Sequence, residues 1–223
     1  EEIDKAGADG IVIATLDAVA WTFNIRGNDV EYNPVAVAYG YVSKNESILF
    51  IDPDKLTQAI ASELQSQGVK MADYSRIFNY IEKLSGKTTV CITENKINYS
   101  LYKALSEKCK VIDLPSPIDL MKSMKNETEL NGFRRAMVKD GVALTRFYMW
   151  LEKAVPTGMV TEMTIAEKLR EFRSKQDQYM GESFGTIAGY AAHGAIVHYS
   201  AIPESNSTVE PKGLLLIDSG AQF

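Results

Sequence analysis

Two polar side chains near the end of the chain are the first candidates for chemistry. His198 lies in the apolar run of residues 195–199, and Asp218 directly follows the apolar run of residues 214–217. Gly, Pro, Ser and Asn bound both runs, so we expect two strands of a buried sheet, each delivering one polar group. An ionised carboxylate buried without a partner is strongly destabilising, so a cation or a dense set of donors should face Asp218. Asp218 is therefore a candidate metal ligand.

Three motifs surround these residues: His193-Gly-Ala-Ile-Val-His198-Tyr, Ile-Pro-Glu-Ser-Asn and Leu-Leu-Ile-Asp218-Ser-Gly-Ala-Gln-Phe. In sequence, order and spacing they resemble the catalytic domain of the aminopeptidase P family, the Xaa-Pro aminopeptidase branch of the pita-bread metallopeptidases. By residue type alone, a histidine on a strand is more often a packed core or edge residue than a catalytic one. The resemblance favours the catalytic interpretation of His198.

The resemblance implies a role for each candidate. Asp218 would be the first ligand of a pair of Mn2+ ions, and His198 would lie beside the scissile bond. There His198 would hydrogen-bond the substrate carbonyl or the developing oxyanion, or shuttle a proton, and the sequence leaves these roles open. The remaining ligands, a second Asp, a His and two Glu, are expected beyond Phe223. We therefore expect this chain to end inside its active site, to bind no metal tightly and to be inactive alone.

The implied activity is metal-dependent hydrolysis that removes the N-terminal residue from peptides with proline in the second position. Hard oxygen ligands with some imidazole suit manganese, which would activate a bridging water. The resemblance also implies a homodimer for the complete enzyme. Two alternatives stay open: a prolidase-like dipeptidase, and a non-catalytic pita-bread module that binds peptides or proteins.

Three further polar residues are interpreted as supporting ones. His193 is assigned a structural or indirect role, because close members of the family tolerate Asn at this position. Arg26 and Asp29 are expected to form a local pair that stabilises the intervening turn, rather than to shape a substrate entrance.

A block earlier in the chain, Trp21-Thr-Phe-Asn-Ile-Arg-Gly-Asn-Asp-Val-Glu-Tyr-Asn-Pro34, resembles the middle domain of the long, three-domain form of the same family. The resemblance implies an α/β and α+β chain: a creatinase-like N-terminal-type α/β domain with a mixed sheet, followed by the first part of a pita-bread catalytic domain. Pro115 and Pro117 suit neither a helix interior nor a central strand, so we expect the boundary there. This gives domains at residues 1–117 and 118–223.

Hydrophobic periodicity and turn residues predict the elements of the first domain. We expect strands at residues 11–15, 88–92 and 110–114, a hairpin of residues 34–43 and 47–51, and helices at residues 16–21, 53–67, 74–84 and 99–108. Asp52 followed by Pro53 should provide the cap and first turn of the second of these helices.

Two helices are predicted in the second domain. Asn126 and Glu129 form a capping-box pattern for a helix that runs to Ala154, with a possible break at Gly141. A second capping-box pattern, residues 164–167, should begin the next helix.

Composition excludes several classes of function. The net charge is −5, with 45% hydrophobic and 24% charged residues, and the basic residues form no stripe, so neither nucleic acid nor an anionic membrane is an expected partner. No apolar run is long enough to span a bilayer. Cys91 and Cys109 lie in strand-like runs without metal-ligand spacing, which favours buried thiols in a reducing compartment, and we expect a cytoplasmic protein.

Overall fold

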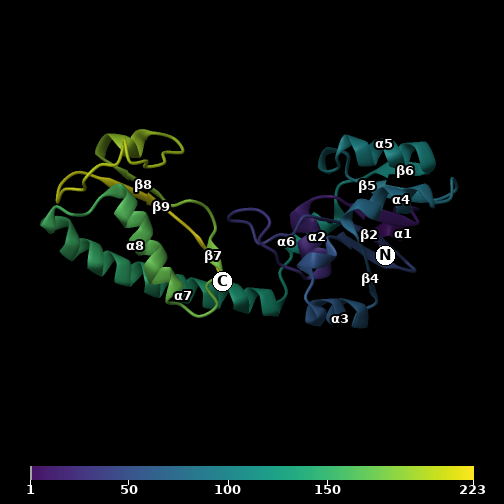
Figure 1. Cartoon of the computed structure of the whole chain (residues 1–223), viewed down its shortest axis with the longest axis horizontal. Helices are drawn as coiled ribbons and strands as arrows, with labels where there is room; N and C mark the ends of the chain where they lie inside the picture. The colour runs from purple at the N-terminus through teal and green to yellow at the C-terminus, as the bar shows by residue number, and fades with distance from the viewer. Residues whose placement is uncertain (1) are drawn as a thin grey trace. The chain divides into compact units, whose positions relative to one another are not determined.

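The structure, a computed structural model, describes residues 2–223 and divides into two compact units (Figure 1). The first unit contains the residues up to Val30 and Pro34–Lys125, and the second contains Glu31–Asn33 and Asn126–Phe223. No helix among residues 2–223 is both long and apolar enough to cross a membrane.

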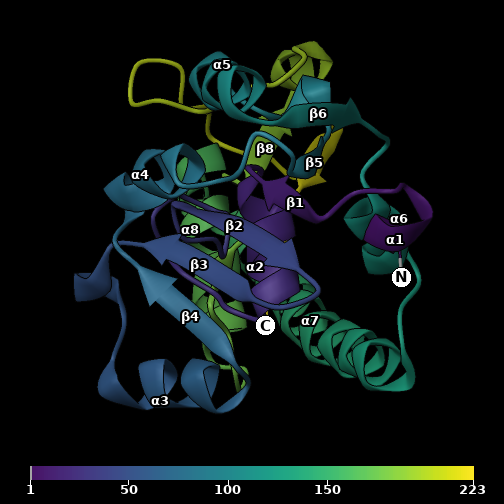
Figure 2. The ribbon, with the colours of Figure 1, turned by 90° about the vertical axis from the view of Figure 1, so that its right-hand side faces the viewer.

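The first unit is built on a mixed six-stranded sheet, as predicted. Its strands are β1 (Gly10–Ile13), β2 (Ala38–Ser43), β3 (Ser47–Ile51), β4 (Val69–Ala72), β5 (Thr89–Ile92) and β6 (Lys110–Asp113). The spatial order is β4-β3-β2-β1-β5-β6, and β2 is antiparallel to both of its neighbours while the other adjacent pairs are parallel. Figure 2 shows β2, β3 and β4 side by side. The predicted β2–β3 hairpin is confirmed.

Helices precede, connect and follow the strands of this unit. They are α1 (Glu2–Lys5), α2 (Leu16–Phe23), α3 (Gln58–Ser66), α4 (Ile77–Glu82), α5 (Tyr99–Lys108) and α6 (Pro117–Ser123), with short 3-10 turns η1 (Pro53–Lys55), η2 (Tyr74–Arg76) and η3 (Glu94–Lys96). The cap predicted at Asp52 is present, but it caps η1, and α3 begins later, where the Thr57 side chain accepts from the N–H of Ile60. Strand β4 was not predicted, because Lys70 interrupts its apolar residues and leaves no apolar run to indicate a strand.

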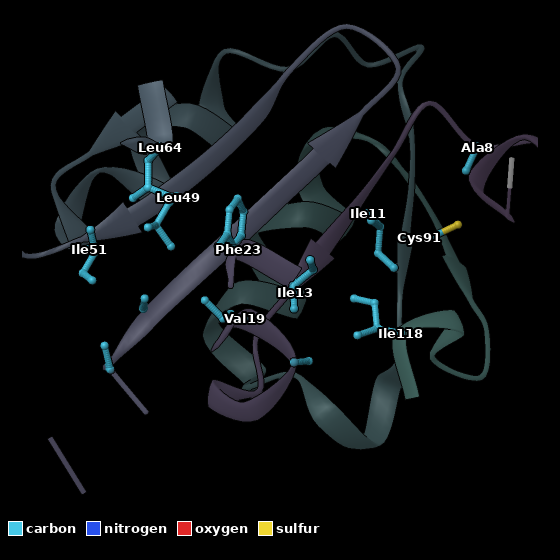
Figure 3. Packing of buried hydrophobic residues seen from close by; sticks show 13 residues of the cluster. Ala8, Ile11, Ile13, Val19, Phe23, Leu49, Ile51, Leu64, Cys91 and Ile118 are labelled. Carbon is cyan, nitrogen blue, oxygen red and sulfur yellow. The ribbon is translucent and has the colours of Figure 1, made fainter. Parts of the chain in front are cut away.

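Apolar side chains are buried on both faces of the sheet, because successive residues of a strand point to opposite sides. In β1, Ile11 and Ile13 pack with Val19 and Phe23 of α2 on one face (Figure 3). On the other face, Val12 packs into a separate cluster with residues of α4 and α5. The first unit therefore has its own two-sided core.

The units divide between Lys125 and Asn126, whereas the sequence places the boundary at Pro117. Ile118 of α6 is 6% exposed and belongs to the core of the first unit. Pro117 begins this helix rather than interrupting the chain, since a proline in the first turn loses no helical hydrogen bond, and Ser116 caps it. The linker is therefore short and follows α6.

Two helices frame the second unit. The first, α7 (Glu127–Ala154), is continuous through Gly141, and its predicted capping box is present: Asn126 and Glu129 exchange side-chain to backbone hydrogen bonds. The second, α8 (Glu162–Ser174), follows the 3-10 turn η4 (Val155–Thr157) and begins earlier than predicted. Its capping box joins Thr161 to Thr164, so the pattern at residues 164–167 was the wrong one.

Beyond α8 the second unit contains short strands, β7 (Gly181–Glu182), β8 (Ile187–Tyr190), β9 (Leu215–Asp218) and β10 (Ala221–Gln222), and the 3-10 turn η5 (Ala191–Ala195). Strands β8 and β9 pair antiparallel, and β7 pairs with β10. Phe147 of α7, Ile165 and Leu169 of α8 and Ala188 of β8 form its core. This core fixes β8 and β9 against α8.

We predict that limited trypsin digestion cuts first after Lys125. Met124 and Lys125 are exposed, lie outside any helix and fall where the two units divide, whereas many other basic residues lie within regular elements, such as Lys110 at the start of β6. Mass spectrometry should detect two fragments that meet at this bond, and Lys125→Gln should delay their appearance. Initial cleavage after Lys110 in both proteins would show that the linker is misplaced.

Candidate functional site

Strand β9 carries the candidate metal ligand at its last residue. Asp218 lies opposite Ile187 of β8, and its side chain shares a face with Leu216, while Ile217 packs against the core. Leu216 is 44% exposed and Asp218 is also exposed. The carboxylate therefore lies on the open face of the β8–β9 pair.

The strand predicted at residues 214–217 is confirmed with a shift of one residue, but the expected burial of Asp218 is wrong for this chain. Its carboxylate lies on the face that the core helices do not cover. Water solvates an exposed carboxylate, so the argument that a buried Asp218 needs a counter-ion does not apply.

His198 does not lie on a strand, which corrects the prediction for residues 195–199. Residues up to Ala195 belong to η5, and His198 follows in a turn with φ of 55°. Two apolar side chains of the run are not core residues, since Ile196 is 53% and Val197 is 82% exposed. Tertiary contacts made by residues beside His198 determine the turn conformation and override the local strand preference.

The turn that carries His198 begins on the same face as Asp218. In η5, Gly194 lies so close to this face that a Cβ atom added to it would be 3.5 Å from the Cβ of Leu216. Gly194 also approaches the backbone of Gly189 in β8, where a side chain would meet the Gly189 oxygen at 3.2 Å. We define the catalytic loop as residues 191–199, named for the predicted role of His198. The structure thus brings the start of this loop to the open face that carries Asp218.

A buried carboxylate holds the catalytic loop. Glu162, the first residue of α8, has a fully buried side chain that accepts four hydrogen bonds. The backbone N–H groups of Tyr190 and Ser207 donate at 2.7 and 3.0 Å, and the Tyr199 hydroxyl donates at 2.8 Å. Nδ1 of His193 lies 2.9 Å from one oxygen and 3.1 Å from the other. Because a carboxylate only accepts, Nδ1 carries the proton in this arrangement.

The Glu162 carboxylate connects segments that are distant in sequence. It contacts the end of β8, the catalytic loop and the segment that leads towards β9. The His193 ring also stacks on Tyr199, with centroids 4.6 Å apart. The backbone reinforces these links, because the N–H of Glu162 donates to the Ser207 carbonyl. We define the Glu162 cluster as Glu162, His193, Tyr199 and the N–H groups of Tyr190 and Ser207.

The pKa of Glu162 reflects two opposing effects. Desolvation raises the pKa of this carboxyl, but the hydrogen bonds from Tyr190, Ser207, His193 and Tyr199 outweigh it, so the net pKa lies below its usual value of 4.5. Desolvation and the neighbouring carboxylate raise the pKa of the Tyr199 hydroxyl, which therefore keeps the proton that it donates. Glu162 is thus ionised at neutral pH despite its burial.

Sequence reasoning missed Glu162. An acidic residue in the first turn of a helix is a common pattern that the helix dipole explains without any further role. Only its burial and its contacts with distant residues distinguish it.

In the first unit, Asp29 forms a longer-range link than expected. Its carboxylate accepts from Lys55 of η1 at 2.6 Å and from the N–H of Val37 at 2.6 Å. These two donors, the lysine first, lower the pKa of Asp29. Asp29 therefore ties its loop to η1 and to the chain ahead of β2, beyond the local turn that was predicted.

The residues present offer one metal ligand of suitable chemistry rather than a complete site. Asp218 provides an exposed carboxylate, the type of donor that hard divalent ions prefer. Among residues 2–223, no group of three or more His, Cys, Asp or Glu side chains could hold a metal ion.

Comparison with known proteins decides the family. The Creatinase/Prolidase N-terminal domain model matches residues 1–129, more than half of the chain. The chain belongs to this family. The model of metallopeptidase family M24 matches residues 131–223, which corresponds to the second unit apart from its short segment at residues 31–33 and the start of α7.

Relatives match along the whole chain. The probable Xaa-Pro aminopeptidase P of Sclerotinia sclerotiorum is 37% identical over 100% of this chain, and Aminopeptidase P2 of Arabidopsis thaliana is 36% identical over the same extent. The chain spans only 39% and 36% of the lengths of these proteins. The resemblance to aminopeptidase P is therefore confirmed for a chain shorter than half of these relatives.

Solved structures confirm the expected fold class. X-prolyl aminopeptidase from Caenorhabditis elegans, described as a cytosolic enzyme with a di-nuclear active site, matches 100% of this chain and 37% of its own, with a TM-score of 0.90 and 31% identity. Xaa-Pro dipeptidase from Bacillus anthracis matches 98% of this chain and 58% of its own, with a TM-score of 0.73 and 18% identity, and shares the fold.

We predict that Glu162→Gln lowers the free energy of unfolding of the second unit at neutral pH by about 1–3 kcal/mol. The substitution replaces one carboxylate oxygen with an NH2 group, which is a donor and would face the donors that now bind Glu162. A lowered pKa in the folded state stabilises the protein above pH 4.5, the usual value, and this contribution disappears as the pH falls through the folded value. The deficit of the variant should therefore shrink below about pH 4.5.

Urea unfolding at several pH values between neutral and acid tests this pH dependence. The fluorescence of Trp150, in a Trp21→Phe background, reports the unfolding of the second unit. Glu167→Gln is the matched control, since Glu167 is an exposed residue of the same helix. An equal deficit at every pH would contradict the assignment of an ionised Glu162.

Proposed function

We propose that the complete protein to which this chain belongs is a metal-dependent Xaa-Pro aminopeptidase. The observation that carries the proposal is the similarity to Xaa-Pro aminopeptidases P over the whole chain, at 37% identity, which includes the catalytic loop and the end of β9. The open face of the β8–β9 pair, with Asp218 on it and η5 packed against it, supports the proposal.

In this proposal, Asp218 holds a metal ion through its exposed carboxylate, together with ligands from outside residues 1–223. A pair of divalent ions, with Mn2+ as the proposed metal, would supply a water of lowered pKa and a polarised carbonyl. His198 would donate a hydrogen bond to the substrate carbonyl or to the developing oxyanion, or move a proton at an imidazole nitrogen. The exposure of His198 and the turn that projects it suit a group that meets substrate.

The proposed substrates are peptides with proline in the second position, as the names of the relatives suggest. A prolidase-like activity is the less favoured candidate, because the dipeptidase from Bacillus anthracis shares the fold at only 18% identity. The proposed location is the cytoplasm, supported by the cytosolic C. elegans enzyme and by the free thiols of Cys91 and Cys109. Homodimer formation stays a prediction from the resemblance.

We predict that His198→Ala in the complete protein lowers kcat on an Xaa-Pro peptide by about 10²- to 10⁴-fold, the usual contribution of a general acid or base. Its metal content should match that of the wild type, because the ligands remain. Steady-state kinetics and elemental analysis measure both quantities, and Lys212→Ala, a substitution of another exposed residue, serves as the control. Loss of metal in parallel with activity would make His198 a ligand instead.

We predict that Asp218→Ala in the complete protein removes at least one of two bound ions, because one carboxylate ligand is lost. Isothermal titration with Mn2+ measures the stoichiometry, and Asp177→Ala, at an exposed position in the second unit, should retain both ions. Retention of both ions with unchanged affinity in Asp218→Ala would exclude Asp218 as a ligand.

A further inference from the structure

The catalytic loop is strained at both of its ends. Ala191 has φ of 52° and His198 has φ of 55°, so each lies in the left-handed region. This region costs an L-residue about 1–2 kcal/mol, and histidine tolerates it better than alanine. Such conformations persist only where surrounding contacts determine them.

The Glu162 carboxylate contacts the neighbour of each strained residue. Tyr190, whose N–H donates to it, directly precedes Ala191, and Tyr199, whose hydroxyl donates to it, directly follows His198. Tyr199 is 8% exposed, whereas His198 beside it is exposed. The carboxylate therefore fixes the chain on both sides of the loop and leaves the His198 side chain outside the core.

His193 adds a third contact from the middle of the loop. Its Nδ1–H is held by both oxygens of Glu162, and its ring stacks on Tyr199. A carboxylate that binds one nitrogen of a histidine fixes the ring orientation and the tautomer. The three contacts together restrain the loop at its start, middle and end.

Resting on the proposed function, we propose that Glu162 is a positioning residue for the hydrolytic reaction: it holds the catalytic loop in its strained conformation and thereby orients His198 towards the substrate. Glu162 itself touches neither substrate nor metal. Its effect passes through Tyr199 and the backbone of the loop. Loss of the carboxylate should therefore lower turnover more than substrate or metal binding.

The test uses the complete protein loaded with Mn2+ and an Xaa-Pro peptide as substrate. Glu162→Gln keeps the shape of the side chain and should lower kcat by about 10- to 100-fold, with KM and metal content within about 2-fold of the wild type. Tyr199→Phe removes one hydroxyl donor and keeps the ring stack, so we expect a smaller loss of about 2- to 10-fold. Glu167→Gln should leave all three quantities unchanged.

The double variant Glu162→Gln/Tyr199→Phe tests whether the two residues act through their shared hydrogen bond. If both residues act through one contact, the loss of kcat in the double variant should be smaller than the product of the single losses. Circular dichroism identifies variants that fail to fold. If Glu162→Gln does not fold, Tyr199→Phe decides alone, and a kcat equal to the wild type would overturn the proposal.

Wild-type turnover is measured first, so that failure of the proposed function can be distinguished from failure of the proposed role of Glu162. A metal-loaded wild type without activity on Xaa-Pro peptides would reject the proposed function and, with it, the role of Glu162. An active wild type with an unchanged kcat in folded Glu162→Gln, or a loss that lies wholly in KM or metal content, would reject only the positioning role.

Discussion

The buried carboxylate of Glu162 is the interaction on which the second unit depends. Removing a carboxylate from water is costly, and here the cost is offset by four donors from three separate segments. The position at the N-terminus of α8 adds the favourable field of the helix dipole. One charge thus joins α8, the end of β8, the catalytic loop and the segment before β9. The geometry around His198 follows from where those donors must lie.

The rest of the unit supplies a rigid base for this interaction. Helices α7 and α8 pack through Phe147, Ile165 and Leu169, all fully buried, and β8 lies on this core through Ala188. A further ion pair joins the helices, because the guanidinium of Arg173 lies 2.7 Å from Asp140 and is 1% exposed. With one face of β8 and β9 fixed, the opposite face is free to carry Asp218. The division between a packed face and an open face is what makes a site there possible.

The sequence predicted most of the first unit and less of the site. Periodicity and capping residues located the β2–β3 hairpin, α5 and α7, because each is determined by local patterns. The 195–199 run was misassigned, because the side chains of His193 and Tyr199 are captured by Glu162, a contact that no local pattern encodes. The position of Asp218 at the end of a strand was predicted correctly, but its exposure depends on which face of the strand the core covers. Family resemblance, rather than periodicity, favoured a catalytic role for His198.

In the proposed function, the Glu162 cluster presents His198 on the face that carries Asp218. The most direct measurement is a crystal structure of the complete protein with divalent ions and a non-hydrolysable Xaa-Pro peptide analogue. We expect Asp218 to be bound to an ion, a His198 nitrogen to lie within about 2.6–3.2 Å of the analogue's carbonyl oxygen or its equivalent, and the Glu162 carboxylate to stay buried against His193 and Tyr199. A structure in which His198 points away from the analogue while the Glu162 cluster is intact would exclude this role of the cluster.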